Sequence, residues 1–159
     1  MAIPFLTKFS VYTPFFLHEI KRTLLMKCSF LFSCSFLLIL STGFGKSYCA
    51  LELIKQRVKV GLPILIVIPR LVLIENWKKE IKKFGLEEYL PKITFTTYQS
   101  LHKYQETEWT CTIYDECHHL SERCKTITEN IYSYYNIFLS ATVKKDLKDW
   151  IIQYQSYHQ

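Results

Sequence analysis

The residues best suited to chemistry are two glycines, a lysine and a serine that follow an apolar run. Residues 37–47 read L-L-I-L-S-T-G-F-G-K-S and contain Gly43, Gly45, Lys46 and Ser47. Glycine lets the backbone bend and approach a ligand closely, so that successive N–H groups can point at phosphate oxygens. The lysine can reach the outer phosphates, and the serine hydroxyl can hold Mg²⁺. This stretch therefore predicts a phosphate-binding loop.

The loop departs from the full phosphate-loop pattern at its first position. The pattern G-x-x-x-x-G-K-[ST] begins with glycine, whereas this chain has Leu40 there. An ordinary glycine turn with an unrelated lysine is the alternative interpretation. The apolar run also imitates a signal peptide or membrane anchor, but its uninterrupted part, residues 28–40, is 13 residues long. Because a membrane span needs about 20 residues, we expect a buried strand instead.

Acidic and hydroxyl side chains follow two later apolar runs. At a strand end facing a phosphate loop, Asp115 can hold the Mg²⁺ that bridges the β- and γ-phosphates. The adjacent Glu116 can orient and deprotonate a water for in-line attack on the γ-phosphorus. Ser140 and Thr142 form either a helix cap or a hydroxyl pair that hydrogen-bonds the loop after Asp115.

Alternating strand and helix patterns position these groups. Apolar, β-branched runs predict strands, and apolar residues at helical spacing predict helices. Strands are expected at 37–40, 64–68, 93–97, 112–114 with its neighbours, and 136–140; helices are expected at 46–57, 74–84, 121–135 and 144–154. This alternation predicts an α/β fold with a parallel sheet and helices on both faces. Ligands of such sheets bind at the carboxyl ends of the strands, where all the groups above fall.

Composition and charge narrow the class of protein. The 159 residues suffice for about one domain, and 49% apolar with 21% charged residues is normal for a globular chain. The six cysteines form no C-x-x-C pair, so we expect reduced thiols in an intracellular, cytoplasmic protein. Residues 1–83 carry a net charge of +9 and residues 84–159 carry −3. The basic first half favours nucleic acid as a partner, although solvated lysines without a partner explain it equally well.

Taken in order, these motifs resemble the first motor domain of superfamily 2 helicases and translocases, the DEAD/DEAH-like group. The resemblance covers residues 36–143, and the most similar subgroups are the type III restriction-like and Swi/Snf-like translocases. The similar motifs are T-G-F-G-K-S (42–47, motif I), V-I-P-R-L-V-L-I-E-N-W-K-K-E (67–80, motif Ia), T-T-Y-Q-S-L (96–101, motif Ib), D-E-C-H (115–118, motif II) and S-A-T (140–142, motif III).

The resemblance implies a RecA-like P-loop NTPase fold, with the motif III strand between those of motifs I and II, and ATP and Mg²⁺ as cofactors. It also implies a role for each matching residue. The implied nucleotide-binding residues are Thr42, Gly43, Phe44, Gly45, Lys46 and Ser47. Ser47 and Asp115 would hold Mg²⁺, and Glu116 would be the catalytic base, acting with Asp115 and Lys46. His118, Ser140 and Thr142 would couple hydrolysis to the grip on nucleic acid, and Pro69, Arg70, Thr96 and Thr97 would touch its sugar-phosphate backbone.

Two departures from the family pattern shape the expected domain organisation. We expect residues 1–35 to be a divergent segment and residues 36–159 to form the ATP-binding domain. The family has an adenine-reading glutamine upstream of motif I, whereas the first glutamine here is Gln56, which leaves adenine selectivity open. The chain ends 17 residues after Thr142. We therefore expect a fragment or truncated product with weak ATP hydrolysis, whose second motor domain, with its arginine finger, is absent or separately encoded.

Three functional hypotheses follow. The leading one is the ATP-binding domain of a DNA or RNA helicase or translocase, which couples ATP hydrolysis to movement on nucleic acid. The alternative is a half-motor module that grips nucleic acid or a partner protein with little or no turnover. A third is a zinc site formed by Cys117, His118, His119 and Cys124, whose spacing fits no common zinc pattern. We expect no membrane contact.

Overall fold

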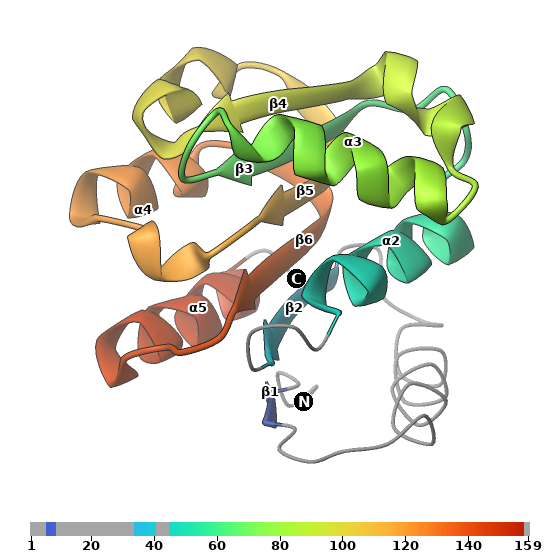
Figure 1. Ribbon diagram of the computed structural model, residues 1–159. Coiled ribbons are helices and arrows are strands. Elements are labelled where there is room, and N and C mark those ends of the chain that lie inside the picture. The colour runs from blue at the N-terminus through green and yellow to red at the C-terminus, as the bar shows by residue number, and fades with distance from the viewer. Residues whose placement is uncertain (1–5, 9–33, 41–44, 158–159) are drawn as a thin grey trace.

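A single six-stranded parallel sheet organises the domain (Figure 1). The computed structural model describes residues 6–8, 34–40 and 45–157. Within them the strand order is β1-β2-β6-β5-β3-β4. The strands are β1 (Leu6–Lys8), β2 (Cys34–Ile39), β3 (Ile64–Ile68), β4 (Ile93–Thr97), β5 (Glu108–Tyr114) and β6 (Tyr132–Ser140). The helices are α2 (Lys46–Arg57), α3 (Leu73–Lys83), α4 (Glu122–Glu129) and α5 (Lys145–Tyr157), with 3₁₀ turns η1 (Glu87–Lys92), η2 (Tyr98–Tyr104) and η3 (Cys117–His119).

Helices cover both faces of the sheet, as the sequence predicts (Figure 1). Successive side chains of a strand point to opposite faces, and every residue of β3 is buried. Ile66 and its neighbours two positions away pack into one cluster with α2 and α3. Leu65 and Val67 pack into a second cluster with η2, α4 and α5. An unbroken apolar strand is therefore stable here because water reaches neither face.

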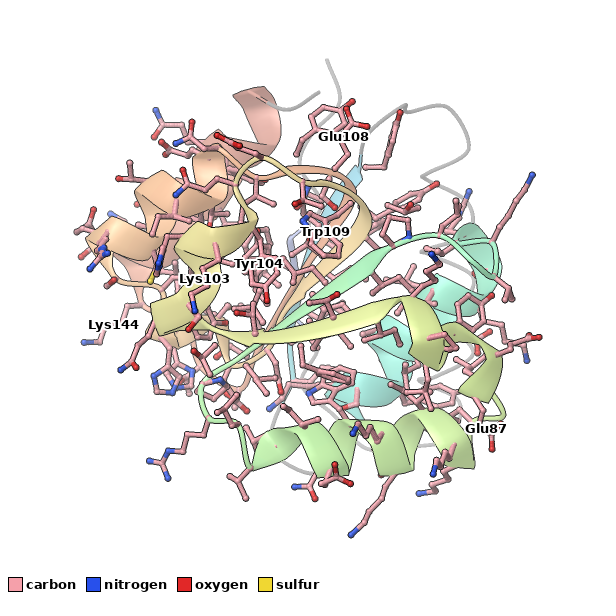
Figure 2. All side chains as sticks on the ribbon, turned by 90° about the horizontal axis from the view of Figure 1, so that it is seen from above. Glu87, Lys103, Tyr104, Glu108, Trp109 and Lys144 are labelled. Atoms are coloured by element: carbon pink, nitrogen blue, oxygen red, sulfur yellow. The ribbon has the colours of Figure 1, made fainter. Side chains whose placement is uncertain are left out.

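Aromatic residues close the second face where β5 begins. Seen from above, Tyr104 of η2 lies beside Trp109 of β5 (Figure 2). Their ring centroids are 5.9 Å apart in an edge-to-face arrangement, which is favourable for aromatic pairs. Contact between η2 and β5 thus fixes the chain segment that follows β4.

The register of the strands brings their carboxyl ends to one edge. Ile39 of β2 pairs with Ser140 of β6, and Val67 of β3 pairs with Tyr114 of β5. The expected position of the 136–140 strand between those leading to Lys46 and to Asp115 is confirmed, because β6 lies between β2 and β5. The loops after these strands therefore lie close together, although they are far apart in sequence.

One predicted helix is too long. The sequence predicts a helix over 121–135, but α4 ends at Glu129 and β6 begins at Tyr132. Tyr132 and Tyr134 are 54% and 46% exposed, whereas Ser133 between them is buried. This alternation is the period of a strand, and aromatic residues favour strands. The Y-S-Y-Y run therefore extends β6 at its start.

Part of the N-terminal segment joins the sheet. Within the segment that we expected to be divergent, β1 pairs in parallel with β2, with Leu6 opposite Leu37. Of the uninterrupted apolar run 28–40 that imitates a membrane anchor, residues 28–33 lie outside the described residues, and residues 34–39 form β2. Of the helices in the described ranges, none is both long enough and apolar enough to cross a membrane.

We predict that Ile66→Ala lowers the free energy of unfolding by about 2–5 kcal/mol, because it leaves a cavity in the centre of the sheet. Urea denaturation followed by circular dichroism measures the loss. Leu62→Ala, at a position that is 39% exposed before β3, is the matched control and should cost less than about 0.5 kcal/mol. Equal losses in the two variants would show that β3 is not at the centre of the core.

Candidate active site

The N-terminus of α2 combines several features that favour an anion. Gly45 precedes the helix with φ of 76°, a left-handed conformation that glycine adopts without strain. No side chain caps the helix, and its first turn contains no acidic residue but begins with Lys46. The first N–H groups of a helix lack intrahelical partners and carry partial positive charge. A lysine placed there adds to that charge, which favours a negatively charged ligand.

An ion pair joins α2 to the end of β5. Lys46 Nζ lies 3.3 Å from Glu116 Oε1, and the lysine side chain is only 11% exposed. Among the described residues, Glu116 alone of the non-glycines has a positive φ, at 48°. Such a conformation costs of order 1 kcal/mol and occurs most often at functional sites. The backbone at Glu116 thus directs its carboxylate toward the first turn of α2.

Asp115 is held by donors from two other elements. The Trp77 indole Nε1–H donates to Asp115 Oδ2 at 3.0 Å, and the Tyr98 hydroxyl donates to the Asp115 carbonyl oxygen at 2.6 Å. Burial raises the pKa of the Asp115 carboxyl above its usual value of 3.8, and the Trp77 hydrogen bond opposes that increase. Sequence reasoning included Trp77 in motif Ia and Tyr98 in motif Ib, but it assigned neither residue a contact with Asp115. No sequence pattern indicates contacts across 38 and 17 positions.

A hydrogen-bond chain links His118 to the end of β6. The Ser140 hydroxyl donates to the Thr142 carbonyl oxygen at 2.7 Å, so it must accept from His118 Nδ1 at 2.9 Å. His118 Nδ1 also lies 3.4 Å from Glu116 Oε2. The network therefore assigns the proton of neutral His118 to Nδ1. Sequence reasoning paired the same three residues, but Thr142 participates through its main chain.

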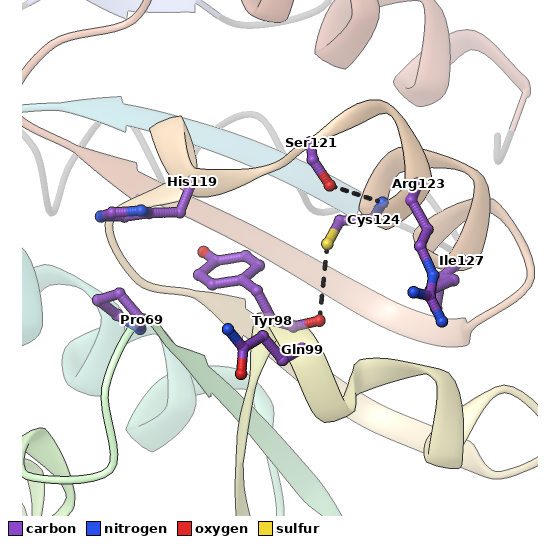
Figure 3. Close-up of a pocket in the computed structure, with 8 residues that line it drawn as sticks. All are labelled: Pro69, Tyr98, Gln99, His119, Ser121, Arg123, Cys124 and Ile127. Carbon is purple, nitrogen blue, oxygen red and sulfur yellow. Dashed lines mark hydrogen bonds between the residues drawn. The ribbon is translucent and has the colours of Figure 1, made fainter.

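The nucleic-acid residues predicted from sequence occupy different environments. Arg70 is exposed in the loop after β3, whereas Thr96 is only 3% exposed and its hydroxyl donates to the Thr97 carbonyl at 3.4 Å. Pro69 lines a cavity of about 340 Å³ between β3, η2 and α4 (Figure 3). Its other lining residues are Tyr98, Gln99, His119, Ser121, Arg123, Cys124 and Ile127. Sequence reasoning missed this cavity, since its lining residues come from three separate segments of the sequence.

The metal hypotheses have different outcomes. Ser47 and Asp115 offer a hydroxyl and a carboxylate, the hard oxygen ligands that Mg²⁺ prefers, so this donor set fits the expected cation.

No group of three or more His, Cys, Asp or Glu in the described ranges is arranged to hold a metal ion. Burial raises the pKa of the Cys117 thiol to about 12, and the Glu116 carboxylate adds to the increase. Cys117 is therefore a neutral thiol, a poor zinc ligand. Thr42, Gly43 and Phe44 lie outside the described residues.

Three features indicate the class of protein. They are the strand order of the sheet, the helix that begins after Gly45 with Lys46, and the acidic pair after β5. Together with the family match, these features identify a RecA-like α/β domain of the superfamily 2 helicase type. The chain belongs to the family described as type III restriction enzyme, res subunit, whose model matches residues 33–145.

Relatives of known type agree with this assignment. The chain is 33% identical over 123 residues to the DNA 3'-5' translocase XPB2 of Sulfurisphaera tokodaii, an alignment that covers 69% of this chain and 27% of XPB2. The SWI2/SNF2 ATPase core of Sulfolobus solfataricus in complex with dsDNA matches with a TM-score of 0.65 and 20% identity, over 89% of this chain and 35% of that one. The UvsW helicase from bacteriophage T4 matches with a TM-score of 0.61 and 17% identity, over 76% and 50%. At these identities, the solved structures show a shared fold.

We predict that Asp115→Asn stabilises the domain at neutral pH. Because the folded-state pKa of Asp115 is raised, the folded chain binds the proton more tightly than the unfolded chain, and stability falls as the pH rises through that raised pKa. The amide removes this cost and still accepts from Trp77. Urea midpoints measured across pH should show a gain at neutral pH that shrinks as the pH falls toward 3.8.

Asp149→Asn, at an exposed position of α5, is the control and should leave the pH dependence unchanged. A lower urea midpoint for Asp115→Asn at neutral pH would contradict the prediction.

Proposed function

We propose that this chain is the ATP-binding half of a helicase-type motor, which couples ATP hydrolysis to movement along nucleic acid. The observation that supports the proposal is the Lys46–Glu116 ion pair of 3.3 Å, because it joins a carboxylate to the first turn of α2. Asp115 next to Glu116 and Ser47 next to Lys46 supply oxygen ligands for a cation at the same place. Family membership supports ATP as the nucleotide.

The ion pair suggests how nucleotide binding prepares hydrolysis. In the free chain, Lys46 neutralises the Glu116 carboxylate. A phosphate oxygen at the N-terminus of α2 would compete for the lysine, because it carries charge and accepts from the same donor. Glu116 would then be released to orient and deprotonate a water for in-line attack. Mg²⁺ held by Ser47 and Asp115 would neutralise charge on the phosphate oxygens.

The His118–Ser140–Thr142 chain is suited to report the state of Glu116. His118 lies within 3.4 Å of the same carboxylate that pairs with Lys46. When Glu116 changes partner, the hydrogen bond from His118 to Ser140 becomes more or less favourable relative to its contact with Glu116. We propose that this exchange couples hydrolysis to the end of β6.

DNA is the proposed nucleic acid, and a second motor domain is the proposed partner. XPB2 is a DNA translocase, and the SWI2/SNF2 core is in complex with dsDNA. Exposed Arg70, together with Arg123 at the cavity, offers cations for backbone phosphates on the same edge of the sheet, and the His119 ring offers a polar N–H beside them. The chain spans 27% of the length of XPB2. An arginine from a second motor domain would complete stabilisation of the transition state.

We predict that Lys46→Ala weakens binding of a fluorescent ATP analogue by about 100-fold or beyond detection, because several charge-assisted contacts are lost together. Salt-sensitive binding of duplex DNA should remain. Fluorescence anisotropy measures both affinities. Lys55→Ala, an exposed lysine at the other end of α2, is the matched control and should change neither. Unchanged analogue binding in Lys46→Ala would instead support a binding module that does not use this nucleotide site.

We predict that Glu116→Gln lowers the rate of ATP hydrolysis by about 10²–10⁴-fold, as expected for loss of a general base. Nucleotide affinity should be equal or higher, because Lys46 no longer has a charged partner. The wild-type chain alone should hydrolyse ATP slowly, so phosphate release is measured at high protein concentration. Glu122→Gln, at an exposed carboxylate of α4, should behave as wild type. If the hydrolysis rate of Glu116→Gln equals that of wild type, Glu116 is not the base.

A further inference from the structure

Asp115 accepts hydrogen bonds from side chains on both faces of the sheet. The Trp77 indole reaches its carboxylate from the cluster that contains α2 and α3. The Tyr98 hydroxyl reaches its carbonyl oxygen from the opposite cluster, which contains α4 and α5. Both aromatic residues are buried, at 3% and 6% exposure. Well-packed donors on both sides leave Asp115 little freedom to turn, because neither ring can move without disturbing its cluster.

Each donor belongs to an element that continues from a loop at the nucleic-acid edge. Trp77 lies in α3, which begins directly after the loop containing Pro69 and Arg70. Tyr98 follows Thr97 directly, at the start of η2.

Tyr98 also lines the cavity that Pro69 lines (Figure 3). Cys124 of α4 donates through its thiol to the Tyr98 carbonyl at 3.5 Å, which ties the same residue to the far wall of the cavity. A nucleic-acid strand bound over this edge would therefore contact α3 and η2, the two elements whose residues donate hydrogen bonds to Asp115.

We propose that Trp77 and Tyr98 are positioning residues that orient Asp115 for Mg²⁺ and link it to the two loops at the nucleic-acid edge. This inference rests on the proposed function, since it takes Asp115 as a ligand of the Mg²⁺ that accompanies nucleotide. Hydrogen-bond partners of a metal-ligating carboxylate fix its orientation, and losing one typically weakens metal binding 10- to 100-fold. DNA that changes these two hydrogen bonds to Asp115 must change the affinity of the chain for Mg²⁺-nucleotide. By thermodynamic linkage, nucleotide must then change the affinity for DNA by the same factor.

The test uses Trp77→Phe and Tyr98→Phe in the full chain, because phenylalanine keeps a ring in each cluster and removes only the donor. The measurement is the Mg²⁺ concentration that gives half-maximal binding of a fluorescent ATP analogue. We expect this concentration to increase about 10-fold in Trp77→Phe and about 5-fold in Tyr98→Phe, whose lost bond is to a neutral acceptor. With Mg²⁺ removed by EDTA, both variants should bind the analogue as wild type does, which a general loss of structure would not produce.

Two matched controls lie elsewhere in the fold. The Trp150 indole donates to Glu129 Oε1 at 3.1 Å, and the Tyr89 hydroxyl donates to the Val58 carbonyl at 2.9 Å. Trp150→Phe and Tyr89→Phe remove the same kinds of hydrogen bond away from Asp115, and neither should change the Mg²⁺ requirement. Repeating the titration with a short DNA duplex measures the coupling, which should fall toward a factor of one in Trp77→Phe and Tyr98→Phe.

The outcomes separate this inference from the proposed function. If wild type binds the analogue with Mg²⁺ and both positioning variants require no more Mg²⁺ than wild type, the inference is overturned and the proposed function stands. If wild type binds no analogue at all, both are overturned. Should one variant fail to fold by circular dichroism, the other decides the result, because each removes a different bond to Asp115.

Discussion

The central strands β2, β6, β5 and β3 run in one direction, so the loops that follow them share an edge whatever their separation in sequence. Hydrogen bonding fixes the register of these strands, and the register in turn fixes which residues meet. Ser140 ends β6 opposite Ile39 of β2, and the Asp115 N–H donates to the Val67 carbonyl at 2.8 Å as β5 ends. A slip of one residue in any pair would turn the buried side chains of that strand toward the wrong face. The two apolar clusters that stabilise the sheet therefore also set the geometry of the site.

The negative charge of the two carboxylates in the site is only partly neutralised. Lys46 lies near two carboxylates, Asp115 and Glu116, yet it pairs with only one of them. Asp115 is largely buried and has the Trp77 indole as its neutral side-chain donor. A buried carboxylate without a full countercharge is unfavourable, and perturbed groups of this kind concentrate at functional sites. The stability of the free domain is thus reduced at the place where a cation and a polyphosphate would restore the balance.

How much the sequence predicts depends on how local the physical signal is. The limits of β3, β4 and α2 follow from unbroken β-branched runs and from helical spacing, and the predicted limits agree with the structure. The position of β6 between β2 and β5 was predicted from the family resemblance. The start of β6 was missed because a tyrosine-rich run carries both helical and strand patterns until packing decides. The residue types of the site, and their place at the carboxyl ends of the strands, were predictable from the sequence. The hydrogen bonds from Trp77 and Tyr98 to Asp115 were not, because they depend on tertiary packing and leave no pattern in the sequence.

The left-handed backbone at Glu116 has an evolutionary consequence. Glycine would adopt a φ of 48° there at no steric cost, although its greater freedom in the unfolded chain offsets part of that gain. Under the proposed function, a glutamate persists here because its carboxylate is worth more to the organism than the folding free energy that the backbone conformation costs. The residue at position 116 should therefore indicate whether a related chain is still under selection for turnover. Under the proposed function, lineages that keep the fold but abandon turnover are free to replace Glu116, whereas lineages that retain the motor are not.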